Sequence, residues 1–180
     1  NYNNKIGYAQ GLNFIVAAAI LVFPEEEQIF IFIDSMINKF KFNKIMGIDN
    51  SEVRFHLELI QALLEKYVPK LCVFLSRQGL SHEFFSTSWI ITIFANVVNH
   101  WTLFKIWDFF IIYGWKFFNA FLISIMIKFE SKILLFDANY LSVLIKGLMK
   151  SSEFDKNFDV IINKSFEIMR IESNIKLYNK

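Results

Sequence analysis

The residue types that most often carry chemistry are few in this chain and widely spaced. The three histidines, His56, His82 and His100, stand 26 and 18 residues apart, and Cys72 is the single cysteine. A zinc site needs several nitrogen or sulfur ligands at short spacings, so we predict no metal site. Cys72 lies in an apolar helical segment, which is typical of a buried and inert thiol rather than of a nucleophile.

Two short segments carry polar residues that an ordinary helical core does not explain. The first is residues 6–14, Ile-Gly-Tyr-Ala-Gln-Gly-Leu-Asn-Phe, in which Gln10 precedes a strongly apolar run. Gly11 and Asn13 are poor residues for a helix interior, so the simplest interpretation is a helix start at which Gln10 satisfies free backbone amides. No Lys-Ser or Lys-Thr pair follows the glycines, which excludes a phosphate-binding loop of the P-loop kind.

The second segment is Trp107-Asp108, which places one acid in a nearly all-apolar stretch. An unpaired charge among aromatic side chains is costly, so we predict that Asp108 is paired or capping rather than free in solvent. Lys105 lies three residues earlier, and a local ion pair on one helix is the simplest partner. We also predict that Trp89 and Trp107 are mostly buried and play a structural role.

The elements that must position these segments are helices. Apolar residues recur every three or four positions, and no strand alternation lasts beyond four residues, so the fold class is all-α: a non-bundle multi-helix domain of eight to ten helices. Asn50 is placed to cap one helix, and Ser152 with Asp155 resembles a capping box for the last one. The expected helices span residues 14–23, 24–39, 50–67, 69–79, 85–98, 102–113, 115–129, 137–149 and 152–168, with a loop at 40–49.

Composition narrows the class of protein. A chain of 180 residues suits one domain with a sizeable core, and 54% apolar residues exclude intrinsic disorder. A net charge of +2 is no basic field of the nucleic-acid-binding kind, so we expect no nucleic-acid partner. Six Gly and two Pro disfavour a turn-rich β-sandwich. We attribute the 22 Phe to an A/T-rich genome rather than to a functional aromatic surface.

Two uncharged runs, residues 6–24 and 84–104, are long enough to be tested as membrane spans. The first begins with a glycine-punctuated polar stretch, and the second carries side chains that would need hydrogen-bond partners in lipid. We therefore predict buried helices and no transmembrane segment. An integral membrane subunit is the alternative, and carbonate extraction would separate the two. We see no signal peptide, and we expect a cytoplasmic protein.

Residues 8–14, Tyr-Ala-Gln-Gly-Leu-Asn-Phe, resemble the Tyr-x-Gln-Gly motif of the TBC domain, the catalytic module of Rab GTPase-activating proteins. Four later blocks are similar to that family in the same order. They are the glutamates 25–27, Pro-Lys-Leu at 69–71 with Gly-Leu at 79–80, the Ser-Trp block at 88–94, and Lys-Ile-Trp-Asp at 105–108 with Gly-Trp-Lys at 114–116. On this resemblance, residues 1–180 are one TBC domain that lacks its N-terminal segment.

The resemblance implies an all-α, roughly V-shaped domain that supplies an arginine and a glutamine to a GTPase. In phosphoryl transfer, charge develops on the γ-phosphoryl group while an attacking water is held in line. Gln10 would be the glutamine that acts in trans, and Gly11 would let the backbone approach the nucleotide. Tyr8 and Asn13 would support the loop. The implied partner is a Rab-family small GTPase in its GTP form, and the domain needs no cofactor of its own because GTP and Mg²⁺ belong to that partner.

The chain also departs from the family pattern. The family's arginine lies some tens of residues before the glutamine motif, whereas this chain has nine residues before Gln10 and no Arg among them. Its arginines come later, at Arg54, Arg77 and Arg170. Two functions therefore stay open: a Rab GTPase-activating domain whose arginine segment lies upstream of Asn1, and a catalytically inactive TBC-like scaffold. Either would suit a role in vesicle trafficking and a peripheral position at endomembranes.

Overall fold

The computed structural model describes residues 10–47 and 50–173. All regular structure in these ranges is helical, which confirms the predicted all-α class. None of the helices in the described part of the chain combines the length and apolarity needed to cross a bilayer. The elements are α1 (Leu12–Ile20), α2 (Glu26–Lys39), α3 (Phe42–Ile45), α4 (Ser51–Tyr67), α5 (Pro69–Arg77), α6 (Glu83–Thr92), α7 (His100–Tyr113), α8 (Trp115–Ile133), the 3-10 helix η1 (Ala138–Tyr140), α9 (Leu141–Met149) and α10 (Ser152–Glu172).

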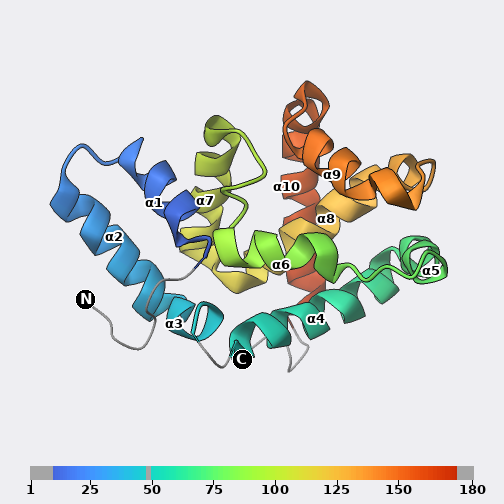
Figure 1. Cartoon of the computed structure of the whole chain (residues 1–180), viewed down its shortest axis with the longest axis horizontal. Coiled ribbons are helices and arrows are strands. Elements are labelled where there is room, and N and C mark those ends of the chain that lie inside the picture. Colours follow the sequence, from blue (N-terminus) through green and yellow to red (C-terminus); the bar gives the residue numbers. More distant parts are fainter. Residues whose placement is uncertain (1–9, 48–49, 174–180) are drawn as a thin grey trace.

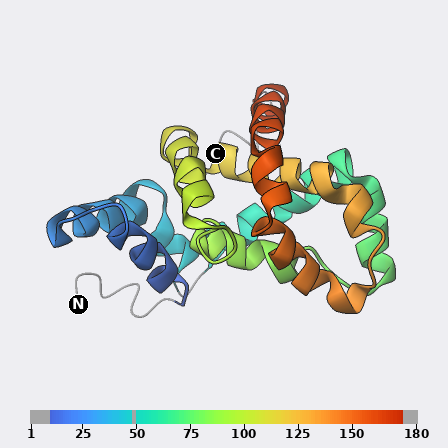
Figure 2. The same cartoon turned by 90° about the horizontal axis from the view of Figure 1, so that it is seen from above.

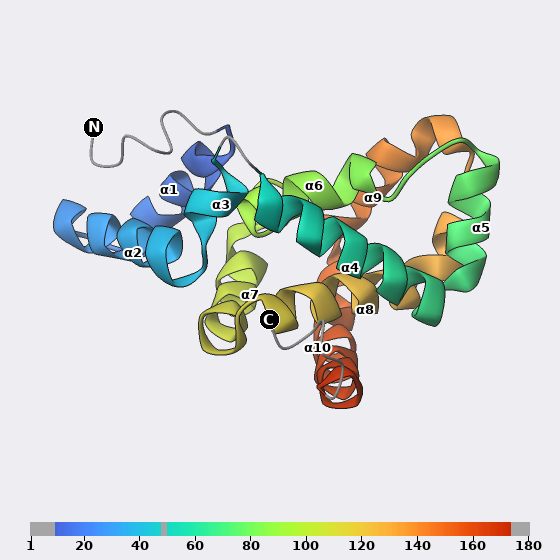
Figure 3. The ribbon, with the colours of Figure 1, turned by 90° about the horizontal axis from the view of Figure 1, so that it is seen from below.

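The helices form an open, angular assembly rather than a parallel bundle. Figure 1 shows α2 and α4 descending toward α3 from opposite sides, so that the lower outline is a V. Helix α1 lies beside α2 at one end of the molecule, and α5 lies at the other end. The view from above shows α7 and α10 extending to the same side of the molecule (Figure 2). The view from below shows α4 running along α6 (Figure 3).

Helix α8 is the centre of the hydrophobic core. Twelve of its 19 residues are buried, and it packs along α10 and against α4, α7 and α9. A helix that is apolar on every side must be covered on every side, which is why the surrounding helices cross it at different angles. Small side chains meet where α8 and α10 pack together: the Ser165 hydroxyl donates a hydrogen bond to the Ser124 hydroxyl at 3.2 Å.

The predicted boundaries of α3 and α10 were wrong. Residues 40–49, predicted as a loop, contain the short helix α3, because Phe42 and Ile45 are almost completely buried and tertiary packing overrides the local turn signals. The predicted capping box at Ser152 is absent as well. Ser151 is the N-cap of α10, and its hydroxyl accepts a hydrogen bond from the Phe154 backbone N–H.

Asp155 serves a different purpose from the predicted one. Its carboxylate accepts a hydrogen bond from the Thr102 hydroxyl at 2.7 Å and two from the Asn99 side-chain amide at 3.2 Å. Asn99 is itself the N-cap of α7 and accepts from the Thr102 backbone N–H. The acid therefore ties the first turn of α10 to the first turn of α7.

A polar pair lies inside the core, between α4 and α8. His56 is 2% exposed, its Nδ1 lies 3.2 Å from the side-chain amide nitrogen of Asn119, and its ring centroid lies 4.3 Å from that of Trp115. Burial lowers the pKa of His56 to about 4, against the smaller opposing effect of the hydrogen bond with Asn119. The imidazole is therefore neutral at pH 7.

We expect the free energy of unfolding to fall as the pH is lowered from about 6.5 to about 4. The unfolded chain takes up a proton on His56 near its ordinary pKa of 6.5, whereas the folded chain does so only near pH 4. In this window the unfolded state binds more protons, so acid favours it, and the loss should reach about 3 kcal/mol. Urea denaturation at a series of pH values between 7 and 4 measures the slope.

The matched variant is His56→Gln, which removes this titration and keeps an amide beside Asn119. The slope between pH 6.5 and pH 4 should become clearly shallower in this variant. It should not vanish, because burial also lowers the pKa of His82, which remains. The same slope in both proteins would contradict the assignment to His56.

Candidate functional site

Gln10 lies exposed in the turn that leads into α1. The next residue, Gly11, is the N-cap of this helix, and its carbonyl accepts a hydrogen bond from the Phe14 N–H. Within the described residues the Gln10 side chain caps no helix end, so the simple role of satisfying free amides is not observed. A free amide at an exposed turn is available to a partner molecule.

Gly11 fixes this turn on the body of the domain. It has φ 106° and ψ −26°, and a Cβ at this position would lie 2.5 Å from Cγ2 of Ile91 in α6. Both the backbone conformation and the close contact therefore require glycine. The family resemblance implies that Gly11 lets the backbone approach a nucleotide. In the structure Gly11 is buried, and the close approach that it permits is to α6 of the same chain.

Helix α6 ends next to this contact, six residues earlier than predicted. After Thr92 the chain turns through Ile93 and Phe94, which have left-handed φ values of 45° and 64°. A positive φ is unfavourable for any side chain and most of all for β-branched isoleucine. Both side chains are completely buried, and Phe94 packs against Trp89, so core packing holds the backbone in this conformation.

Trp107 supports the same turn from α7. Its indole Nε1–H donates to the Ile93 carbonyl oxygen at 3.0 Å, which pairs a carbonyl that the end of α6 leaves free. Trp89 is 1% exposed and Trp107 is 5% exposed, which confirms the predicted burial of both rings. The two segments singled out in the sequence are thus joined through one structural feature: Gly11 packs on the end of α6, and Trp107 holds the turn that follows it.

The prediction for Asp108 was wrong. Asp108 is exposed, and among the described residues it makes no hydrogen bond or ion pair. Positions 101, 105, 108 and 112 share the outer face of α7, so the carboxylate keeps its hydration and needs no protein partner. Lys105 does not pair with it either: its ammonium lies over the Phe158 ring, 5.7 Å from the centroid.

Tyr8 and Asn13 are the two remaining residues of the predicted site. Tyr8 lies outside the described residues. Asn13 is exposed in the first turn of α1, three residues after Gln10. Three residues of chain span at most about 11 Å, so Asn13 can contact a molecule that also reaches Gln10.

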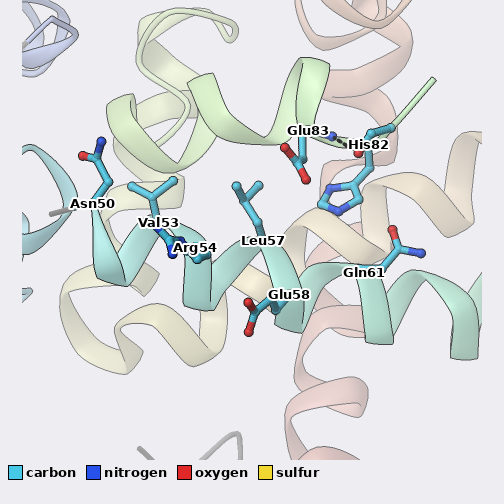
Figure 4. Close-up of a pocket in the computed structure, with 9 residues that line it drawn as sticks. Asn50, Val53, Arg54, Leu57, Glu58, Gln61, His82 and Glu83 are labelled. Atoms are coloured by element: carbon cyan, nitrogen blue, oxygen red, sulfur yellow. Dashed lines mark hydrogen bonds between the residues drawn. The ribbon is translucent and has the colours of Figure 1, made fainter. Parts of the chain in front are cut away.

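A groove of about 690 Å³, which the sequence did not predict, lies between α4 and the start of α6 (Figure 4). Figure 4 shows Leu57 of α4 facing His82 and Glu83 across it. The His82 ring is buried, and its Nδ1 lies within hydrogen-bond distance (2.9 Å) of the Ser86 hydroxyl. Burial lowers the pKa of His82. The groove is formed by residues from two separate helices, so no local sequence motif predicts it. The one feature of the sequence that points to it is the polar face of α4. Its lining residues are Asn50, Val53, Arg54, Leu57, Glu58, Gln61, Ser81, His82 and Glu83.

Helix α6 joins this groove to the Gln10 turn. The groove touches the N-terminal end of α6 at Glu83, and Gly11 packs on the C-terminal end at Ile91. A ten-residue helix is about 15 Å long, which is well within the width of an ordinary protein–protein interface.

We expect Gly11→Ala to cost more stability than Gly79→Ala. Both glycines have a positive φ, 106° and 66°, so each alanine meets a backbone penalty of about 1–2 kcal/mol. A Cβ at Gly79 meets no atom within 4 Å, whereas a Cβ at Gly11 meets Ile91. The additional cost at Gly11 should be about 1–3 kcal/mol in urea denaturation. Equal costs would contradict the contact, and Ile91→Ala should recover part of the difference in a double-mutant cycle.

Trp107→Phe should destabilise the domain by about 1–3 kcal/mol, because it leaves the buried Ile93 carbonyl unpaired. Trp107→Ala should cost about 3–5 kcal/mol, since it also removes a buried ring. Trp101→Phe is the control, because Trp101 is largely exposed on the same helix. Thermal or urea unfolding of the three variants measures these effects, and a Trp107→Phe variant as stable as Trp101→Phe would disprove the supporting role of the hydrogen bond.

Comparison with known proteins identifies the family. The family model of the Rab-GTPase-TBC domain matches residues 1–135. The chain is 25% identical to Rab GTPase-activating protein tbc-11 of Caenorhabditis elegans, over 98% of this chain and 19% of that protein. It is 29% identical to TBC1 domain family member 2A of Ailuropoda melanoleuca, over 64% of this chain and 12% of that protein. It is 31% identical to the small G protein signaling modulator 3 homolog of Xenopus laevis, over 61% of this chain and 14% of that protein.

The chain spans less than a fifth of the length of these three relatives. The family match nevertheless takes in the Gln10 turn, all of α6 and the supporting Trp107. With three quarters of its residues inside that match, the chain belongs to the Rab-GTPase-TBC domain family.

Proposed function

We propose that this domain stimulates GTP hydrolysis by a Rab-type small GTPase and that Gln10 enters the partner's nucleotide site in trans. The observation that carries the proposal is the place of Gln10. It is exposed, it lies in a turn that Gly11 fixes on α6, and it belongs to the part of the chain that matches the family. The relative tbc-11 is named a Rab GTPase-activating protein, which supports the class of partner.

The chemistry of an amide suits this role. A glutamine side chain accepts at its oxygen and donates at its nitrogen, so it can hold an attacking water and contact the phosphoryl group at once. In GTP hydrolysis that water must lie in line with the leaving group. Gln10 needs no cofactor for this, because GTP and Mg²⁺ enter with the GTPase. The packing of Gly11 on Ile91 supports the proposal, since a fixed turn lowers the entropic cost of placing the amide.

The charge on the γ-phosphoryl oxygens requires a second group. An arginine in this position contributes about 10³–10⁵ in rate. At about 1.36 kcal/mol for each factor of ten, this is roughly 4–7 kcal/mol. Residues 1–9 contain no Arg. We place the arginine upstream of Asn1, as the family resemblance implies.

We also propose that the groove beside α6 contacts the GTPase next to its nucleotide site. Arg54, Glu58 and Glu83 are exposed at the groove and give it charges of both signs. Mixed charges of this kind fix the register of a partner and speed its association more than they raise affinity. Arg54→Ala should therefore weaken association and leave the maximal rate of the bound complex unchanged.

A second candidate function is a scaffold that binds a partner without stimulating hydrolysis. The two candidates differ in one respect that can be measured: only the first requires Gln10.

Single-turnover GTP hydrolysis on a panel of Rab GTPases tests the proposal. We expect residues 1–180 alone to give little or no stimulation, because Gln10 positions water and does not neutralise the phosphoryl charge. The longer protein that includes an upstream arginine segment should stimulate strongly, and Gln10→Ala in that protein should remove most of the effect. Gln28→Ala is the matched control, since Gln28 is exposed on α2, apart from the proposed site.

Three outcomes would count against parts of this account. Strong stimulation by residues 1–180 would disprove the need for an upstream arginine, and its loss in Arg54→Ala would assign that role to Arg54. Equal activity of the longer protein with and without Gln10 would disprove the site. A longer protein that binds the GTP form of a Rab and stimulates none of the panel would favour the scaffold.

A further inference from the structure

Helix α8 ends in an apolar corner that faces solvent. Leu135 is 84% exposed and Phe136 is 41% exposed, and Tyr140 and Val143, a few residues further along the chain in η1 and α9, are 65% and 70% exposed. Single exposed apolar residues are ordinary, but several within nine residues of chain indicate a surface that meets something other than water. Figure 1 shows this corner at the end of the molecule opposite α1 and α2.

Helix α5 lies beside the corner (Figures 1 and 3). It presents a half-exposed Val73 between Lys70 and Arg77, which share its helix face and are exposed. These three residues and Leu134 line one shallow hollow of about 540 Å³. The side chain of Glu130 accepts a hydrogen bond from the first turn of α5, which holds α5 against the end of α8.

The charges around the corner are mainly positive. Helix α5 and residues 128–150 together carry a net charge of +4, against +2 for the whole chain, so the remainder of the chain is net negative. Both acids in this set are engaged: Glu130 with α5, and Asp137 with the Asn139 backbone N–H. One acid outside the set, the exposed Glu65 of α4, lines a hollow with Val73 and Arg77 and accepts a hydrogen bond from the Gln61 side chain; with it counted, the net charge of this end is still +3. Among the cations, Lys132 pairs with Glu153. The basic residues of this set are Lys70, Arg77, Lys128, Lys132, Lys146 and Lys150.

We propose that this corner, defined as Val73, Leu135 and Phe136 with the flanking Lys70 and Arg77, docks on the surface of a bilayer that contains anionic lipids. An apolar tip can enter the boundary between headgroups and acyl chains without spanning the membrane, and cations beside it are attracted to anionic headgroups. A bilayer is deformable, so it accommodates a protruding side chain such as Leu135 without a preformed hollow.

The neighbouring charges favour this corner, rather than a second exposed apolar surface of the same molecule, as the site that binds anionic lipid. The turn between α1 and α2 also exposes apolar side chains, at Ile20 and Leu21. The residues that follow there are the exposed glutamates 25–27, which anionic lipid would repel. Docking at the α5 and α8 corner would leave α1 and α2, at the opposite end of the molecule, away from the lipid (Figure 1). The proposal does not depend on the GTPase-activating function.

Co-sedimentation of the 180-residue chain with phosphatidylcholine vesicles, with and without phosphatidylserine, tests the proposal. The chain should pellet with the phosphatidylserine vesicles and release in high salt. Lys70→Glu with Arg77→Glu should weaken this binding at least about tenfold, and Leu135→Ser with Phe136→Ser should do the same. All four positions are exposed or partly exposed, so thermal unfolding should confirm that the variants remain folded.

Matched controls test whether binding depends on this corner or only on the overall charge and exposed apolar surface of the chain. Lys39→Glu with Lys44→Glu makes the same charge change at α2 and α3, and Ile20→Ser with Leu21→Ser removes equally exposed apolar residues. Both controls should bind as the parent chain does. Failure to pellet with phosphatidylserine vesicles would overturn the proposal. So would binding that the corner variants retain, or an equal loss in the controls.

A local probe reports whether the corner itself enters the lipid. Leu135→Cys in a Cys72→Ala background carries one thiol for an environment-sensitive dye. Its emission should shift to the blue with phosphatidylserine vesicles and stay constant with phosphatidylcholine alone. A protein that pellets while the dye does not shift would show that a different surface binds, and it would overturn the assignment to this corner.

Discussion

The turn at Ile93 and Phe94 is the constraint on which the arrangement of the other helices depends. Two consecutive left-handed residues cost about 1–2 kcal/mol each, and isoleucine bears this cost least well. Complete burial of two large apolar side chains contributes about 1.5–3 kcal/mol each, which offsets it. Phe94 reaches Phe118 and Phe121 in α8, so the turn directs the chain from α6 into the centre of the core.

Three further contacts link this turn to distant parts of the chain. Trp107 pairs the Ile93 carbonyl, Gly11 packs on Ile91 just before the turn, and Asp155 fixes the first turn of α7, which carries Trp107. The exposed Gln10 therefore sits on a support built from residues up to 145 positions away in the sequence. A local motif supplies the amide, and the C-terminal half of the domain determines where that amide lies.

Local periodicity was enough to predict most helices, because each buries an apolar stripe of the expected spacing. It failed where tertiary packing decides. The helix over 85–98 ends at Thr92 because Ile93 and Phe94 are drawn into the core. The prediction for Asp108 failed because, in a helix rich in aromatic residues on every side, the sequence does not indicate which face is outward. Residue types alone singled out the Gln10 segment, but only the family resemblance predicts a role for Gln10 in hydrolysis, since an exposed amide by itself indicates no chemistry. The groove could not be predicted, because its two walls belong to helices about 30 residues apart.

An apolar-rich chain poses a general problem for assigning docking surfaces, since exposed hydrophobic side chains occur at both ends of this molecule. Their area does not separate them: Leu21 and Leu135 are both largely exposed. The neighbouring charges do, because glutamates 25–27 follow the first and lysines and an arginine surround the second. Electrostatic attraction acts over roughly a Debye length of about 8 Å, so it biases an approaching surface before any apolar contact forms. The sign of the local charge therefore determines which apolar surface meets which partner.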